Sequence, residues 1–296
     1  MSKKTHQQQL AARKAQRQAE RDAERRRQRR MLAVTLTAIA AVVVVIVGLF
    51  VVLGNNGDDT PAASDTPSPS QSAAAPGPEN KPKTIPTALA AAPKRTTPLA
   101  SEVDCTYKKG EAASKPVNPP SNGKVKASGT SKVTLGTSIG DLHLTLDSAL
   151  APCTVKSFLS LVGQKYFDNT SCHRLTVGAG LQVLQCGDPT KDPAAQGSGG
   201  PGYSFNDEVY PQLKYGRGIL AMANSGPNTN GSQFFIVYGD ASALNPAYTA
   251  FGTVDADGLK AIDKVANAGV IPGPQGGPTD GRPYIPVEIK TATAAA

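Results

Sequence analysis

Residues 31–53 contain no charged side chain, and 18 of these 23 residues are Val, Ile, Leu or Ala. A helix of this length would be roughly 34 Å long, which is enough to cross a hydrocarbon core of about 30 Å. The valine run at 42–45 disfavours a helix in water, but in lipid a single span has no other way to pair its backbone groups. The sequence therefore predicts one transmembrane helix over residues 31–53, in contact with membrane lipid.

The excess positive charge lies on one side of this apolar stretch. Residues 1–30 hold eleven of the 31 Lys and Arg but only three of the 23 Asp and Glu, so they account for the whole net charge of +8. Because positive flanks stay in the cytoplasm, residues 1–30 are predicted to be a basic cytoplasmic tail, with everything after the span outside the cytoplasm. The alternative is a cleaved signal peptide, but its apolar region would be only about 7–15 residues long. The rest of the chain has no net charge, so no nucleic-acid partner is expected.

Composition divides the remaining chain near residue 122. Half of the 24 prolines lie in residues 55–122, among Ala, Ser, Thr and Gly, and such a segment buries too little apolar surface to offset its conformational entropy. Residues 54–122 are therefore predicted to be a disordered linker. Thirteen of the 15 Phe and Tyr residues follow residue 122, so residues 123–296 are predicted to form one folded domain.

The pattern of this domain is mainly β. Alternating apolar residues at 132–137 and 141–146 predict a hairpin. Helices are predicted at 152–162, where a proline occupies the first turn, and at 258–268. The shorter β-like runs are 172–175, 182–185, 218–223, 233–238, 248–254 and 287–290. Many short strands with two helices favour an antiparallel barrel or sandwich with helical caps.

One motif is more specific than these patterns. Residues 223–236 read Ala-Asn-Ser-Gly-Pro-Asn-Thr-Asn-Gly-Ser-Gln-Phe-Phe-Ile, which closely resembles the signature of the cyclophilin peptidyl-prolyl isomerases. Further matching segments are 166–174, 184–188, 197–203 and 251–254, so that the resemblance covers about residues 125–293. It implies a closed eight-stranded antiparallel barrel capped by two helices, here preceded by the transmembrane helix and the disordered linker. It also implies an enzyme that accelerates cis–trans isomerisation of X–Pro bonds without a metal or cofactor. The implied partners are proline-containing segments of secreted or cell-envelope proteins, whose folding it would assist.

The resemblance assigns roles to individual residues. Arg174 matches the catalytic arginine, whose charged donor stabilises the pyramidal proline nitrogen of the twisted amide. Gln185 matches the glutamine that steadies the arginine and the substrate backbone. Asn224, with the backbone of Ala223, matches the groups that hold the residue beside proline. The rest of the implied substrate groove consists of Val183, Gln233, Phe235, Leu244 and Tyr248.

The chain departs from the family pattern at several places. Gln182 stands at or near an aromatic groove position, Tyr248 stands where many members have His, and the chain has no Trp. The resemblance therefore makes no prediction of cyclosporin binding. His173 is interpreted as structural. Two alternatives stay open: a proline-peptide binding or chaperone module with weak catalysis, and a main role for the basic tail with the outer domain as a passenger.

The four cysteines all lie on the predicted outer side of the membrane. They are Cys105, Cys153, Cys172 and Cys186. An extracytoplasmic location permits disulfides, and four cysteines allow three pairings. The closest spacing is 14 residues and there is no Cys-x-x-Cys pair, so a metal site is not expected. A bond from Cys105 into the domain would explain why a Cys and a Tyr interrupt the linker at 103–107.

Overall fold

The computed structural model describes residues 75–273 and 277–295 of the 296-residue chain. The predicted basic tail (1–30), transmembrane helix (31–53) and first part of the linker (54–74) lie outside the described residues. All described residues belong to one compact unit, which begins after residue 70. Within 75–273 and 277–295, no helix combines the length and the apolar composition needed to cross a membrane.

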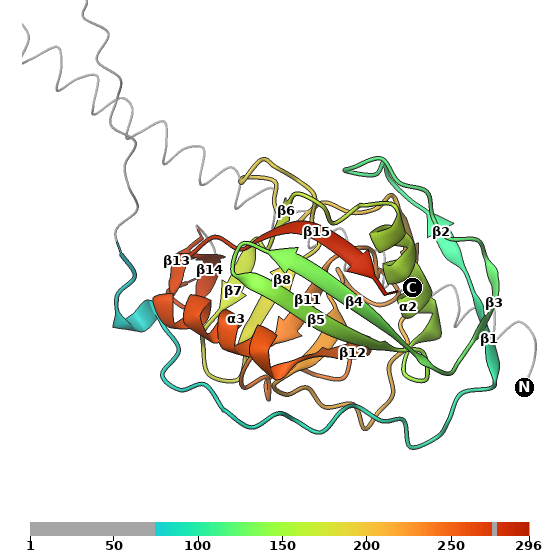
Figure 1. Cartoon of the computed structure of the whole chain (residues 1–296), viewed down its shortest axis with the longest axis horizontal. Helices are drawn as coiled ribbons and strands as arrows, with labels where there is room; N and C mark the ends of the chain where they lie inside the picture. Colours follow the sequence, from blue (N-terminus) through green and yellow to red (C-terminus); the bar gives the residue numbers. More distant parts are fainter. Residues whose placement is uncertain (1–74, 274–276, 296) are drawn as a thin grey trace, which may run out of the picture. The chain divides into compact units, whose positions relative to one another are not determined.

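A curled sheet of eleven strands forms the centre of this unit (Figure 1). In chain order its strands are β4 (Thr130–Thr137), β5 (Gly140–Asp147), β6 (Thr170–Ser171), β7 (Arg174–Thr176), β8 (Val183–Cys186), β10 (Ile219–Met222), β11 (Phe234–Val237), β12 (Ala250–Val254), β13 (Val270–Pro272), β14 (Asp280–Pro283) and β15 (Glu288–Ala294). The spatial order is β13-β14-β7-β8-β11-β10-β12-β5-β4-β15-β6, and all neighbours pair antiparallel. The predicted hairpin is β4–β5, and each predicted β-like run overlaps a strand.

The hydrogen bonding does not form the closed eight-stranded barrel that the resemblance implies. In the part of the chain that the structure describes, the sheet ends in two edges, β13 and β6. The strand expected at 172–175 begins only at Arg174, because β7 pairs with β8 from that residue on, whereas the preceding strand β6 ends at Ser171 and pairs with β15. Cys172 and His173 belong to neither strand, and Cys172 is bonded instead to Cys186. One isolated antiparallel bridge, between Ser171 and Asp188, joins the edge strand β6 to the segment just after β8.

The two predicted helices are present with boundaries one or two residues different. Helix α2 (Pro152–Gly163) packs against β15, and α3 (Ala256–Ala268) packs against β5. The first amides of α2, from Cys153 and Thr154, donate to the Glu208 carboxylate at 3.0 and 2.8 Å, so a distant acid replaces a local cap. Helix α3 has its own cap, since the Asp255 carboxylate accepts from the Gly258 amide at 3.0 Å.

Strands β10 and β11 are buried on both faces. On β11, Phe234 and Ile236 join the main core with α2 and α3, whereas Phe235 and Val237 belong to a second apolar cluster. Successive side chains of a strand point to opposite faces, so one face fills the centre of the domain and the other supports a cluster nearer the surface. The second face carries most of the predicted site residues.

Residues 75–122, assigned to the linker by composition, lie along the domain (Figure 1). We call them the belt. Asn80, in the short helix η1 (Pro78–Asn80), donates to the Pro278 carbonyl at 2.8 Å, and Arg95 donates to the carbonyls of Leu150 and Glu208 at 2.8 and 2.7 Å. Strand β1 (Glu102–Cys105) pairs with β3 (Gly123–Lys126), and β2 (Tyr107–Lys109) pairs with β9 (Tyr203–Phe205). The predicted boundary at residue 123 therefore lies inside a packed region.

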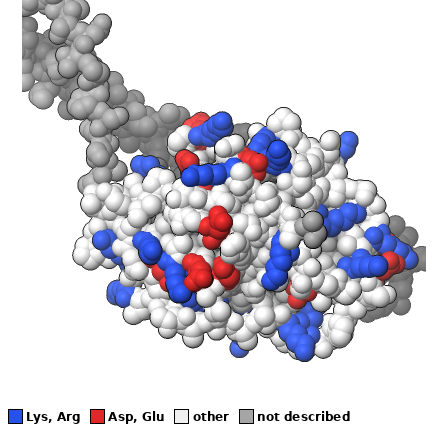
Figure 2. All heavy atoms as spheres, viewed as in Figure 1, with Lys and Arg blue, Asp and Glu red and all other residues white. Residues whose placement is uncertain are grey.

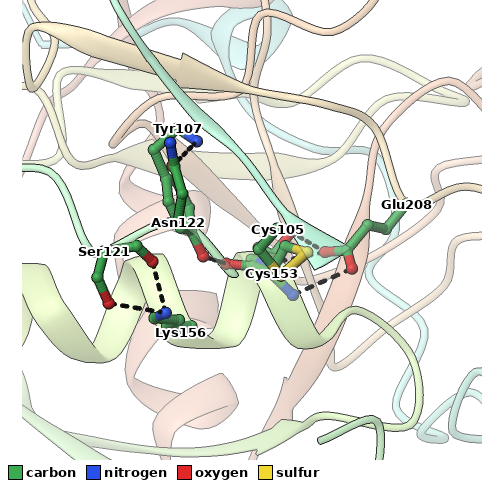
Figure 3. The surroundings of a disulfide bond; sticks show 8 residues. Cys105, Tyr107, Ser121, Asn122, Cys153, Lys156 and Glu208 are labelled. Atoms are coloured by element: carbon green, nitrogen blue, oxygen red, sulfur yellow. Dashed lines mark hydrogen bonds between the residues drawn. A yellow bond between two sulfur atoms is a disulfide. The ribbon is translucent and has the colours of Figure 1, made fainter. Parts of the chain in front are cut away.

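A disulfide bonds the belt to the first turn of α2 (Figure 3). The four cysteines pair as Cys105–Cys153 and Cys172–Cys186, so Cys105 is bonded into the domain. Beside the first bond, the Tyr107 hydroxyl donates to the Cys153 carbonyl at 2.8 Å. Further along α2, the Lys156 ammonium donates to the Ser121 carbonyl at 2.6 Å. Composition missed this attachment because it depends on backbone pairing and one covalent bond rather than on many apolar side chains.

The surface of the described part carries both signs of charge. On the face shown in Figure 2, Lys and Arg are interspersed with Asp and Glu. This agrees with a net charge that comes from residues 1–30 alone.

We expect the double variant Cys105→Ser/Cys153→Ser to lose stability. The bond closes a separation of 48 residues, and removing such a crosslink costs roughly 2–4 kcal/mol, chiefly through the entropy of the unfolded chain. Denaturant unfolding under oxidising conditions measures this loss, and limited proteolysis should find new cleavage within residues 105–122. The control is Thr106→Ala, an exposed neighbour expected to change stability by less than about 0.5 kcal/mol. An unchanged free energy of unfolding in the double variant would contradict the attachment.

Candidate active site

The second face of β7, β8, β11 and β10 places the predicted site residues in one row. In the sheet register Arg174 lies opposite Gln185, Gln185 opposite Phe235, and Phe235 opposite Ala221. Directly opposed residues share a face, and neighbouring strands are about 4.8 Å apart, so the row is roughly 14 Å long. It joins a charged end at Arg174 to an apolar end at Phe235.

Arg174 is held in a fixed orientation by two neighbours. Its Nε and Nη2 donate to the two carboxylate oxygens of Asp280 at 2.8 and 2.6 Å, and its Nη1 donates to Gln185 Oε1 at 3.1 Å. Hydrogen bonding to Asp280 raises the pKa of Arg174 although partial burial opposes this, so the guanidinium stays charged. A guanidinium has five N–H donors, and these contacts leave one at Nη1 and one at Nη2 for a ligand.

Asp280 is a site residue that the sequence did not predict. It is 106 residues away from Arg174 and lies outside every matched motif segment, in the sequence Thr-Asp-Gly-Arg-Pro. The pairing of β14 with β7 brings it beside the arginine. A partly buried arginine needs an acidic partner, so the sequence could predict that Arg174 has one. It could not predict which of the 23 Asp and Glu residues is that partner.

Gln185 continues the network toward a glycine-rich loop. Its Nε2 donates to Gln233 Oε1 at 2.9 Å, and Gln233 Nε2 donates to the carbonyls of Gly197 and Gly199, both at 2.9 Å. The Asp188 carboxylate accepts from the amides of the same two glycines at 2.6 and 2.9 Å. Burial opposes ionisation of Asp188, but the hydrogen bonds from Thr190 and the glycines together lower its pKa. Each amide side chain in this chain of bonds thus has a defined orientation.

The apolar end of the row is a cluster of aromatic rings. Phe235 and Tyr248 lie with ring centroids 5.6 Å apart, and Tyr215 lies 6.4 and 6.3 Å from them. The Tyr215 hydroxyl donates to the Tyr248 carbonyl at 2.6 Å and accepts from the Tyr248 amide at 2.9 Å. Val183 and Leu244 belong to the same cluster, so the structure brings together all four predicted apolar groove residues. Tyr215 was not predicted, because no motif segment contains it.

Asn224 lies beside this row with its side chain already engaged. Its Nδ2 donates to the Ala247 carbonyl at 3.0 Å, and its Oδ1 accepts from the Gly226 amide at 3.2 Å. Ala223 is held to the end of β11 through its amide, which donates to the Gln233 carbonyl at 2.9 Å. Asn224 therefore ties the motif loop to the segment that precedes Tyr248.

Gln182 is buried, with 3% of its surface exposed, and does not line the groove. Its Nε2 donates to the Thr84 carbonyl of the belt at 2.8 Å, and its Oε1 accepts from the Asp240 amide at 2.7 Å. Val183 and Gln185 face the site, so the side chain before them faces the other way. The side chain of Gln182 therefore contacts the belt and Asp240 instead of the groove.

His173 is partly buried next to Arg174 in the sequence. Burial lowers its pKa, so the ring is neutral at pH 7. Among the described residues, neither ring nitrogen has a hydrogen-bond partner.

Comparison with known proteins identifies the family of this site. Residues 132–294 match the family described as "Cyclophilin type peptidyl-prolyl cis-trans isomerase/CLD". The "Probable peptidyl-prolyl cis-trans isomerase B" of Mycobacterium leprae is 51% identical over 190 residues, covering 60% of this chain and 63% of that protein. The protein of the same description in Mycobacterium tuberculosis is 47% identical over 201 residues, covering 63% and 62%. The chain thus spans less than two thirds of the length of these relatives.

A solved structure is also similar to the chain. It is the crystal structure of a Cryptosporidium parvum cyclophilin-type peptidyl-prolyl cis-trans isomerase in the presence of the dipeptide Ala-Pro. It is 36% identical, covers 56% of this chain and 99% of that chain, and has a TM-score of 0.46.

Proposed function

The chain belongs to the cyclophilin-type peptidyl-prolyl cis-trans isomerase family, and we propose that it accelerates cis–trans isomerisation of X–Pro bonds. The observation that carries the proposal is the row from Arg174 to Phe235, in which a fixed cation with two unused donors lies on the same face as an apolar cluster. Such an arrangement fits a proline ring at one end and its amide at the other.

The reaction is a rotation about the X–Pro amide bond, in which no covalent bond is made or broken. The barrier is ~18–20 kcal/mol because rotation breaks the amide resonance, and uncatalysed exchange takes tens of seconds or longer. In the twisted state the proline nitrogen regains its lone pair and accepts a hydrogen bond that the planar amide does not. The unused N–H groups of Arg174 would donate this bond, while the cluster around Phe235 holds the ring. An interaction made only in the twisted state lowers the barrier instead of tightening substrate binding.

The main alternative is a proline-peptide binding or chaperone module with weak catalysis. One observation favours it: the Asp280 carboxylate already forms a bidentate ion pair with Arg174, which compensates part of the charge that would act on the nitrogen. We favour the enzyme because the same pair leaves two donors free and fixes their direction.

Replacing Arg174 tests the proposed mechanism. We expect Arg174→Ala to lower kcat by about 10²–10³-fold, the usual effect of removing one transition-state donor. Arg174→Lys keeps the charge but loses the paired donors, so most of the activity should also be lost. The measurement is the isomerisation rate of an X–Pro peptide with the full chain, alongside Lys264→Ala, which removes an exposed cation on α3. No acceleration by the folded wild type would refute the enzyme; full activity of Arg174→Ala would refute the role of Arg174.

Asp280→Asn separates a positioning role from a restraining one. The variant loses the charged bidentate contact that fixes Arg174, so we expect kcat/KM to fall roughly tenfold, mainly through kcat, as the donors lose their direction. Asp257→Asn is the matched control, because its carboxylate pairs only with the exposed Lys260. A faster Asp280→Asn enzyme would mean that the ion pair holds Arg174 back, which would support the binding-module alternative.

We also propose that the domain acts outside the cytoplasm, anchored by residues 31–53 with residues 1–30 inside. The support is the uncharged 23-residue stretch and the basic segment before it. The two disulfides add to it, since such bonds persist in oxidising compartments. Its substrates would then be proline-containing segments of secreted or envelope proteins.

Protease accessibility tests this orientation. Protease added to intact cells should remove residues 75–296 and spare an epitope tag placed before residue 1. A cytoplasmic protein of the same cells, probed in parallel, shows that the cells remained closed. Protection of the domain in cells that degrade other surface proteins would overturn the orientation.

A further inference from the structure

The two strands that carry Arg174 and Gln185 are joined by a very short ladder. Strand β7 has three residues and forms two pairs with β8, at Arg174 and Leu175. On its other side β7 pairs with β14 only at Leu175 and Thr176. By contrast, all four residues of β8 pair with β11. Arg174 is therefore the end residue of a weakly held strand, whereas Gln185 belongs to a strand with a firm neighbour.

The register of this ladder reappears three residues before Arg174. The isolated antiparallel bridge between Ser171 and Asp188 has the same register as the pair Arg174–Gln185. The two residues between these pairs, 172–173, belong to no strand. The backbone that leads into Arg174 thus passes over a gap of two residues in its pairing with the neighbouring segment.

The Cys172–Cys186 disulfide crosses this gap. Cys172 comes two residues before Arg174, and Cys186 directly follows Gln185. Both cysteines are buried and belong to the main core. Because successive side chains of a strand point to opposite faces, Cys186 faces away from the row that contains Gln185. The bond therefore joins the start of β7 to β8 from the core side of the sheet.

We propose that Cys172 and Cys186 are positioning residues for the reaction. Their bond fixes the backbone before Arg174 relative to β8 and thereby sets the direction of the unused guanidinium donors. The inference rests on the proposed function, in which these donors act on the proline nitrogen. Asp280 and Gln185 orient the tip of the arginine side chain, whereas the disulfide holds the backbone from which that side chain extends.

A positioning role of this kind predicts an effect on kcat. A displacement of about 1 Å in a catalytic group can lower the rate by up to 10²-fold. The cysteines lie in the core and the apolar cluster that would hold the proline ring is on the other face, so substrate binding should change little. An interaction that matters only in the transition state lowers kcat and leaves KM nearly unchanged.

The test compares two double variants of the full chain, each lacking one disulfide. They are Cys172→Ala/Cys186→Ala and, as the matched control, Cys105→Ala/Cys153→Ala; alanine avoids placing a hydroxyl in the core. The first bond closes a separation of 14 residues and the control bond one of 48, so the control should lose more stability. We expect the opposite order in the isomerisation assay. Loss of Cys172–Cys186 should lower kcat about tenfold with KM within about twofold, whereas the control should keep kcat within about twofold of the wild type.

Reduction provides a second measurement that needs no new side chain near Arg174. In Cys105→Ala/Cys153→Ala the remaining bond is the only one possible, and dithiothreitol converts it to two thiols while being oxidised itself. We expect kcat to fall about tenfold when thiol titration shows both thiols, and to return when oxidised glutathione re-forms the bond. The same treatment of Cys172→Ala/Cys186→Ala, which retains only the belt disulfide, should leave its kcat unchanged.

The outcomes separate the positioning role from the proposed function. If Cys172→Ala/Cys186→Ala folds and keeps the wild-type kcat, the positioning role is wrong and the proposed function stands. If that variant does not fold, the reduction experiment decides, and an unchanged kcat with both thiols free overturns the role. If the wild type accelerates no X–Pro peptide, the proposed function is wrong and the positioning role is overturned with it.

Discussion

The ion pair between Arg174 and Asp280 determines how the rest of the site is arranged. A partly buried guanidinium needs acceptors for its donors, and Asp280 takes the Nε edge while Gln185 takes one donor at Nη1. Gln185 then has only its amide nitrogen to offer Gln233, and Gln233 in turn donates to two loop carbonyls. The orientation of every polar group in the row therefore follows from the carboxylate at one end. Preorganisation of this kind lets a single cation act without first reorganising its surroundings.

The row exists because two neighbouring strands, β10 and β11, are apolar on both faces. On β11, Phe234 and Phe235 are both buried, one in the main core and one in the second cluster. Burial on the inner face fixes the register of β11, since a slip of one residue would move the core side chains to the outer face and the outer side chains into the core. The fixed register then places Gln185 opposite Phe235 and Arg174 opposite Gln185. Packing in the core thereby sets the positions of Arg174 and Gln185 on the opposite face of the sheet.

The sequence pattern predicted the elements that depend on residues close together in the chain. The hairpin β4–β5 and both helices follow from side-chain periodicity. The apolar groove was predicted by the resemblance to the cyclophilins, and its four residues lie together in the structure. The parts that failed depend on distant pairing. Asp280 reaches Arg174 only through the β14–β7 ladder, and the strand predicted at 172–175 begins only at Arg174, where the pairing of β7 with β8 starts. No window of sequence contains both halves of such a contact.

The belt shows why composition misjudged residues 75–122. A segment poor in aromatic residues cannot stabilise itself, yet it can be ordered by a domain that supplies the other half of each contact. Here the domain offers strand edges, carbonyl groups and one cysteine, and the covalent bond at Cys105 reduces the entropy that these weak contacts must offset. The order of residues 107–109, which follow that bond and pair with β9, therefore depends on an oxidised cysteine pair. Under the proposed location outside the cytoplasm, the same compartment that supplies unfolded substrates would also keep both disulfides formed.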